Sequence, residues 1–142
     1  MADYFSVTRT SRFRVTDEDK FRQLLKKLIS WGPLGDEVFV SETKEGGDTY
    51  FVLCTEGDFE YEVDPDNDDW DIEVFYKELQ EIIHPDDVYI EWSQGNEKFR
   101  YFGASAVIIT KDRIEYLNFS DTIGNAVREL TGNKDFSLND VM

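Results

Sequence analysis

Between Glu56 and Asp68 every second residue of the chain is an aspartate or a glutamate, and no lysine or arginine interrupts them. A period of two is typical of a β-strand, on which alternate side chains share one face. Dense like charges oppose folding unless water solvates them. We therefore expect this segment to turn its acids outward and to bury the residues between them, Phe59, Tyr61 and Val63.

The acidic excess is confined to the middle of the chain. The 142 residues carry 31 acids and 15 bases, which gives a net charge of −16. Residues 36–97 hold 21 of the acids and only two lysines, whereas residues 1–35 have a net charge of +3 and residues 98–142 are neutral. This charge would repel nucleic acids and anionic membranes, so it excludes a direct binder of either. Solubility alone would not require the acids to gather in one third of the chain.

Length and composition predict a single domain over residues 1–132, followed by a short C-terminal tail over residues 133–142. No apolar run approaches the roughly 20 residues needed to cross a bilayer, and residues 1–5 lack the basic and apolar regions of a signal peptide. The only cysteine, Cys54, excludes an internal disulfide framework. We therefore expect a cytoplasmic protein.

Hydrophobic periodicity predicts an α+β fold, in the order β-α-β-β-β-α-β-β-β-α, with a mainly antiparallel sheet of about six strands and three helices on one of its faces. The predicted strands cover residues 4–15, 37–43, 49–55, 58–63, 88–93, 98–110 and 113–119. Thr16, Asp69 and Ser120 are the expected helix N-caps, and the helices end near Trp31, His84 and Gly132.

Some side chains of this fold have a predicted direction or role. The first strand is expected to turn Phe5, Val7, Phe13 and Val15 to one side, and the third helix to bury Ile123, Ala126, Val127 and Leu130. Residues 94–97 are expected to form a turn. The three tryptophans are expected in the core or at its edge: Trp31, Trp70 and Trp92.

Catalytic chemistry has little support in the sequence. His84 is the only histidine and is read as a helix-terminal residue, and Cys54 lies in an apolar run that predicts a small buried side chain. No nucleophile signature surrounds either residue, and no glycine pattern for phosphates or dinucleotides occurs. We predict a protein that is not an enzyme and uses no cofactor; a Cys-His pair is the one enzymatic arrangement left open.

A calcium site is a further alternative. Asp64, Asp66 and Asp68 match positions 1, 3 and 5 of the EF-hand loop. Position 6 should be glycine and is Asp69, and position 12 should be glutamate and is Phe75, so the match fails as an EF-hand. Ca²⁺ binding by clustered carboxylates stays open.

The acidic segment itself points to a partner with a basic surface. Carboxylates on one strand face lie about 6.7 Å apart, which is of the same order as the roughly 3.4 Å spacing of phosphates along one DNA strand. The leading hypothesis is a nucleic-acid mimic that inhibits a basic DNA- or RNA-binding protein, and the alternative is a generic acidic docking module for a basic protein. The predicted partner-binding residues are Glu56, Asp58, Glu60, Glu62, Asp64, Asp66, Asp68, Asp69, Trp70, Asp71, Glu73, Glu78 and Glu81.

Basic residues on the predicted strands allow two readings. They are either internal partners of the acids or a positive patch that docks the acidic face of a second copy in a homodimer. The residues concerned are Arg9, Arg12, Arg14, Lys98, Arg100 and Arg113.

Three short motifs, residues 4–10, 13–20 and 94–101, resemble small uncharacterised acidic proteins carried by bacterial plasmids, conjugative elements and phages. The likeness spans most of the chain. Such elements often carry antirestriction and anti-CRISPR inhibitors, several of which are acidic DNA mimics, so the resemblance implies a defence nuclease, such as a restriction or CRISPR effector, as the partner. It assigns no catalytic or binding residue.

Overall fold

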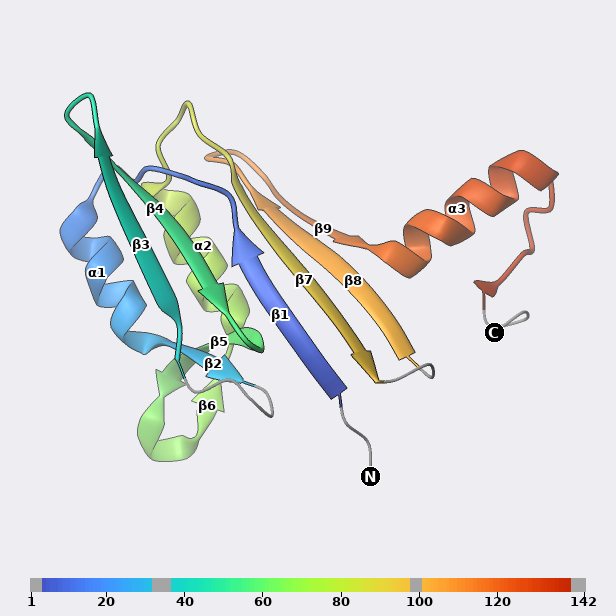
Figure 1. The fold of residues 1–142 in the computed structure, drawn as a ribbon, viewed down its shortest axis with the longest axis horizontal. Helices are drawn as coiled ribbons and strands as arrows, with labels where there is room; N and C mark the ends of the chain where they lie inside the picture. The colour runs from blue at the N-terminus through green and yellow to red at the C-terminus, as the bar shows by residue number, and fades with distance from the viewer. Residues whose placement is uncertain (1–3, 32–36, 98–100, 139–142) are drawn as a thin grey trace.

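The computed structural model describes residues 4–31, 37–97 and 101–138, and these form the predicted α+β fold with mostly antiparallel strands (Figure 1). The larger sheet has six strands in the order β3-β4-β1-β7-β8-β9. Its strands are β1 (Tyr4–Thr10), β3 (Phe39–Glu45), β4 (Asp48–Thr55), β7 (Tyr89–Glu97), β8 (Tyr101–Ile109) and β9 (Ile114–Asn118).

The acidic strand belongs to a second, smaller sheet, which the sequence did not predict. Here β5 (Asp58–Asp64) lies between two short strands, β2 (Leu28–Trp31) and β6 (Asp69–Trp70). The helices are α1 (Glu18–Lys27), α2 (Ile72–Ile82) and α3 (Phe119–Thr131), with a 3₁₀ turn, η1 (Pro65–Asn67), between β5 and β6. Within the described residues, none of these helices has the length and apolar character that spanning a membrane requires.

The core lies between the large sheet and the pair α1 and α2, which cover the same face of that sheet (Figure 1). We call this the inner face and the opposite side the outer face. The ring of Phe13 packs edge-on against Phe21 of α1 at 5.5 Å and against Tyr89 of β7 at 5.1 Å between centroids. Phe51, Phe75 and the other buried apolar side chains complete this single core.

The predicted direction of the first strand is wrong. Ser6, Thr8 and Thr10 of β1 face inward and are buried, whereas Val7 is about half exposed on the outer face. The inner face of β1 meets backbone groups that need partners: the Thr8 hydroxyl donates to the Gly57 carbonyl at 2.7 Å, and the Leu53 amide donates to the Thr10 hydroxyl at 2.9 Å. The strand ends at Thr10, so the alternation of β1 does not extend to Phe13. Phe13 therefore points into the core, although its odd number would place it on the outer face of a continued strand.

Helix α1 begins one residue later and ends earlier than predicted. Asp17, not Thr16, is the N-cap, and its carboxylate accepts from the Lys20 amide at 3.0 Å. The helix stops at Lys27 because Leu28 opposes Tyr61 in the pairing of β2 with β5, so the last part of the predicted helix becomes a strand. Tertiary pairing overrides the helical spacing here.

The two hairpins differ in how well the sequence predicted them. Strands β3 and β4 form the expected pair, and Gly46 and Gly47 at their turn both have positive φ, as a tight hairpin requires. In contrast, residues 94–97 are not a turn: they continue β7 and pair with β8. Residues 98–100 of the predicted strand 98–110 lie outside the described part of the chain.

Helix α3 does not cover the large sheet. It extends from β9 away from the rest of the fold (Figure 1), with Asn118 rather than Ser120 as its N-cap and Gly132 as its C-cap, as predicted. Of its four predicted core residues, Ile123 and Val127 are half-buried, whereas Ala126 and Leu130 are exposed. Residues 133–138 fold back beside the helix, where the Arg128 guanidinium donates to the Phe136 carbonyl at 2.6 Å.

Candidate functional site

The acidic strand β5 has the predicted alternation, but its acids are less exposed than expected. Phe59 and Tyr61 are buried in the core, and Asp58, Glu60 and Glu62 lie on the other face of the strand, each of them half-buried. Val63 is not in the core. The pairing of β5 with β6 shifts between Glu62 and Asp64, and this β-bulge leaves Val63 unpaired and exposed.

Two tryptophans flank these acids. Antiparallel partners that oppose each other share a face, and Trp31 opposes Asp58 while Trp70 opposes Glu62. Their side chains are 57% and 44% exposed, and Trp92 on β7 is 51% exposed, so the prediction that the tryptophans lie in the core or at its edge is wrong. Trp92 lies on the outer face of the large sheet, opposite the face that α1 and α2 cover, and periodicity along a single strand could not reveal this.

The acids that follow β5 make local hydrogen bonds. The Asp64 carboxylate accepts from the Asp66 amide at 3.1 Å and from the Asn67 side chain at 2.6 Å, and so caps η1. Asp68 adopts a left-handed conformation with φ of 49°. Asp71, not Asp69, caps α2 by accepting from the Glu73 amide at 3.0 Å.

The structure gives the calcium alternative no support in this loop. Both carboxylate oxygens of Asp64 accept from protein donors, and Asp69 and Trp70 leave the loop as β6. Across residues 4–31, 37–97 and 101–138 there is no group of three or more acidic, histidine or cysteine side chains placed to hold a metal ion.

Helix α2 distributes its acids differently from the predicted continuous line. Glu73 is exposed in the first turn, Glu78 accepts from the Tyr61 hydroxyl at 2.9 Å, and Glu81 forms an ion pair with Lys20 at 3.2 Å. Burial, together with the Glu78 carboxylate, raises the pKa of Tyr61 well above its usual value. Of the three, Glu73 lies nearest in sequence to the acidic loop, and Glu81 is neutralised.

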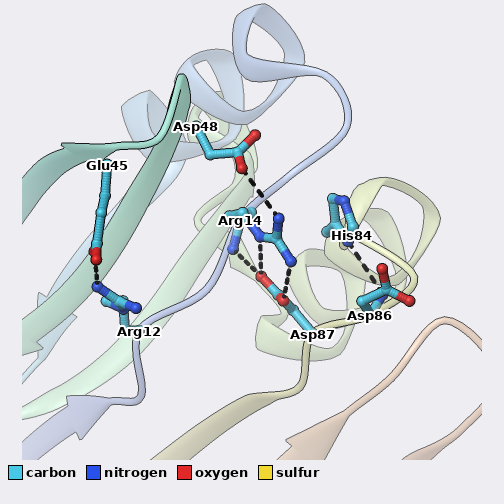
Figure 2. Close-up of polar contacts among 7 residues, drawn as sticks. All are labelled: Arg12, Arg14, Glu45, Asp48, His84, Asp86 and Asp87. Atoms are coloured by element: carbon cyan, nitrogen blue, oxygen red, sulfur yellow. Dashed lines mark hydrogen bonds and ion pairs between the residues drawn. The ribbon is translucent and has the colours of Figure 1, made fainter.

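The N-terminal arginines neutralise acids outside the predicted partner-binding set. Arg12 pairs with Glu45 at 2.6 Å, and Arg14 donates to both oxygens of Asp87 and to Asp48 (Figure 2). This bidentate contact holds the pKa of Asp87 below its usual range. Arg22 pairs with Glu42 and Arg113 with Glu115. The prediction that basic residues are internal partners is confirmed for Arg12, Arg14 and Arg113; Lys98 and Arg100 lie outside the described residues.

The thirteen predicted partner-binding residues thus keep most of their charge unpaired. Within the described chain, Glu81 is the only one of them in an ion pair, and the acids from Glu56 to Glu78 have no lysine or arginine within ion-pair distance. All of them except Glu56 lie on one continuous segment, β5-η1-β6-α2, which Figure 1 draws in green to yellow-green below and behind the large sheet. We call residues 56–78 the acidic lobe.

A cleft of about 440 Å³ adjoins the acidic lobe. It lies between β5 and α2 on one side and the inner face of β7, β8 and β9 on the other. Its wall carries acidic, phenolic and hydroxyl groups, which include Asp58, Glu73, Tyr76, Glu91, Ser93 and Tyr116. Such a wall attracts cations.

Glu91 is the residue of this cleft that sequence reasoning missed. Its side chain is only 6% exposed, and its two oxygens accept from the Tyr89 hydroxyl at 2.6 Å and the Tyr76 hydroxyl at 2.7 Å. Burial raises the pKa of Glu91 despite these two donors. The sequence did contain an indication of this role. Glu91 is two residues after Tyr89 on the same strand, so both side chains are expected on the same, inward face. An inward carboxylate is buried only with hydrogen-bond partners.

Asp58 links the cleft to the acidic lobe. It lies at the start of β5, where burial raises its pKa and neighbouring serine and threonine hydroxyls oppose that rise. Its negative charge also raises the pKa of Glu91. Two carboxyl groups of raised pKa therefore lie on the wall of one cleft.

The described residues give no support to the Cys-His alternative. Cys54 is half-buried on the outer face of β4. His84 follows α2, and its Nδ1 accepts from the Asp86 amide at 3.1 Å (Figure 2). Among the described residues, no hydrogen bond joins the two side chains.

Comparison of the chain with protein-family models, curated protein sequences and solved structures found no match to any of them.

Proposed function

We propose that this protein is a non-enzymatic acidic interaction protein whose acidic lobe enters the nucleic-acid-binding groove of a basic partner and blocks it. The observation that carries this proposal is which acids form ion pairs and which do not. The arginines of the N-terminal segment pair with acids at 42, 45, 48 and 87, while the acids from Glu56 to Glu78 keep no cation within the described chain. Unpaired charge at fixed positions is available to a partner.

The lobe presents its charge on a rigid frame. Asp58, Glu60 and Glu62 project from one strand, and Asp64 and Asp71 are held by the caps that they form. A preordered array loses little conformational freedom when it binds. Its negative field would also speed association with a basic groove, and both the rate and the affinity would fall as salt rises.

Trp70 would supply the apolar contact that charge alone lacks. It is exposed between Asp69 and Asp71, and it opposes Glu62 across the β5–β6 pair. Binding energy in protein interfaces concentrates in aromatic residues that a partner can desolvate completely. Trp70 at the middle of the lobe fits that role, with the carboxylates around it as a charged rim.

The resemblance of the short motifs to proteins of mobile elements directs the first tests toward defence nucleases. Tagged protein is incubated with bacterial lysate in low and in high salt, the captured proteins are identified, and each purified complex is tested for DNA binding. We expect enrichment of nucleic-acid-binding proteins in low salt only, and we expect their complexes to have lost DNA binding. A complex that still binds DNA would instead support the generic docking module.

A charge-matched pair of variants separates the lobe from net charge. Glu60→Lys with Glu62→Lys changes the charge of the lobe, and Glu42→Lys with Glu45→Lys makes the same total change on β3, where both acids are already paired. We expect the first variant to lose the captured partner and the second to keep it. Equal losses in the two variants would show that net charge, rather than the lobe, governs binding.

A further inference from the structure

Among the described residues, no helix covers the outer face of the large sheet. Its acids Glu45, Asp48 and Glu115 lie outside two rows of residues that are almost without charge. One row of residues crosses all six strands in register, and a second row, Val7, Gln94 and Ala104, lies beside it. Both α1 and α2 lie on the opposite side of the sheet (Figure 1). The residues of the first row, from β3 to β9, are Phe39, Cys54, Arg9, Trp92, Ala106 and Leu117.

This face is unusual for so acidic a chain. Charged residues make up 32% of the sequence, yet Arg9 is the only charged residue in the two rows. Phe39, Val7, Trp92 and Leu117 are each about half exposed. A hollow of about 310 Å³ lies beside Trp92, between Val7 and Ala104. The largest exposed apolar patch on a soluble protein is often a contact surface.

A second apolar surface is partly exposed among the described residues. Helix α3 extends away from β9, and its apolar residues recur at helical spacing. Leu130 is 87% exposed and Phe119 is 54% exposed, so much of this stripe is in water. The charged residues of α3 are Asp121, Arg128 and Glu129, which leave it close to neutral.

We propose that the protein forms a homodimer in which α3 of each copy lies across the outer sheet face of the other. The two surfaces match in length, because a helix of 13 residues is about 20 Å long and six strands span about 24 Å. The hollow beside Trp92 would receive an apolar side chain of the partner's helix.

Charge favours a second copy at this face and opposes it elsewhere. Two chains of net charge −16 repel each other where their acidic lobes meet. The two rows of the outer face carry only Arg9, and α3 is close to neutral, so these surfaces can approach a second copy without that repulsion. The lobe packs on the inner side of the sheet and stays accessible in this dimer, so the inference does not depend on the proposed function.

The contact area depends on α3. The first row covers roughly 24 Å by 7 Å and the second, which crosses three strands, roughly 10 Å by 7 Å, so the sheet contributes about 240 Å² and α3 adds roughly 200 Å². Together they supply about 440 Å² per partner, which is below the roughly 600 Å² of a standard interface and in the range of weak, transient ones, so we expect a weak dimer. The sheet face alone falls well short of that area.

Sedimentation velocity on the full chain tests the proposal over the low to high micromolar range, in low and in high salt. We expect a species of twice the 16.6 kDa chain mass, and we expect it to persist in high salt because the contact is apolar. Leu130→Glu and Trp92→Glu should each yield monomers with an unchanged circular dichroism spectrum, since both side chains are exposed. Trp70→Glu adds the same charge to an exposed tryptophan of the lobe, and this control should remain dimeric.

A wild-type chain that stays monomeric throughout would overturn the proposal. So would a dimer that dissociates in Trp92→Glu but survives in Leu130→Glu, because the face would then pair without the helix. A dimer lost equally in Trp70→Glu would show that added charge, rather than this face, controls association. Failure of the partner capture described above leaves these outcomes unaffected.

Discussion

Replacing Glu91 with alanine should cost more stability than any other single loss of an acid in this protein. Glu91 lies at the inner face of β7, where its two oxygens accept from the hydroxyls of Tyr76 and Tyr89. Both tyrosines are buried. In Glu91→Ala, neither phenol has an acceptor or ready access to water, so two buried donors lose their partner at once.

The expected magnitude follows from that count. Each buried donor left unsatisfied costs about 1–3 kcal/mol, so the loss for Glu91→Ala is roughly 2–6 kcal/mol in the free energy of unfolding. That is a large part of the roughly 5–15 kcal/mol that stabilises a typical domain. Glu91→Gln keeps the shape and one of the two acceptor oxygens, so only one phenol loses its acceptor and the loss should be about 1–3 kcal/mol, smaller than that of Glu91→Ala.

The pH dependence of these variants follows from the raised pKa of Glu91. Because the folded state raises this pKa above 4.5, the native protein binds the proton more tightly than the unfolded chain. The resulting stabilisation is complete below the unfolded pKa and is lost as pH rises through the folded pKa. Wild type should therefore lose stability relative to Glu91→Gln as pH rises from acid to neutral.

Urea unfolding followed by circular dichroism, at a series of pH values, measures both effects. Glu115→Ala is the matched control, because Glu115 is exposed on β9 and its removal should change stability by about 0.5 kcal/mol or less. The reasoning is refuted if Glu91→Ala costs no more than Glu115→Ala. It is equally refuted if the difference between wild type and Glu91→Gln stays constant with pH.

Three further predictions concern the frame around the site. Asp87→Asn should lower stability at neutral pH and leave it unchanged in acid. The reason is that Arg14 depresses the pKa of Asp87, and the resulting stabilisation is lost as pH falls through the folded pKa. Thermal melts at a series of pH values check this. Gly57→Ala should cost about 1–3 kcal/mol in urea unfolding, because φ is +154° and a Cβ would lie 2.7 Å from the Trp31 carbonyl oxygen. Millimolar Ca²⁺ should leave the melting temperature unchanged, because the Asp64 oxygens already have protein donors, and a chelator-reversible rise would contradict this.

Most elements could be predicted because their signals are local. The β3–β4 hairpin depends on two glycines and the alternation around them, and the Gly132 cap depends on one residue. Errors at helix starts were small, since Asp17 and Asp71 are caps within two residues of those expected. Neighbouring polar residues compete for the same capping geometry, and only the position of the first helical turn decides between them.

The parts that failed depend on contacts between distant segments. Leu28 follows a good helical pattern, yet it pairs with Tyr61 of β5 and continues the chain as a strand. Val7 has the pattern of a core residue, yet it faces outward because Thr8 meets the Gly57 carbonyl on the inner side. Residue patterns describe each segment alone and carry no record of what will pack against it.

The sequence by itself determined which segments have the residue pattern of a strand, a helix or a turn. It also determined that the negative charge is concentrated between residues 36 and 97. Only the tertiary structure decided which of those charges stay free. Arg14 reaches Asp87 across 73 residues, and the buried carboxylate of Glu91 finds Tyr76 on α2. Such pairings form when the sheet and the helices close around one core, because ion pairs and buried hydrogen bonds depend on distance in space, which local sequence does not encode.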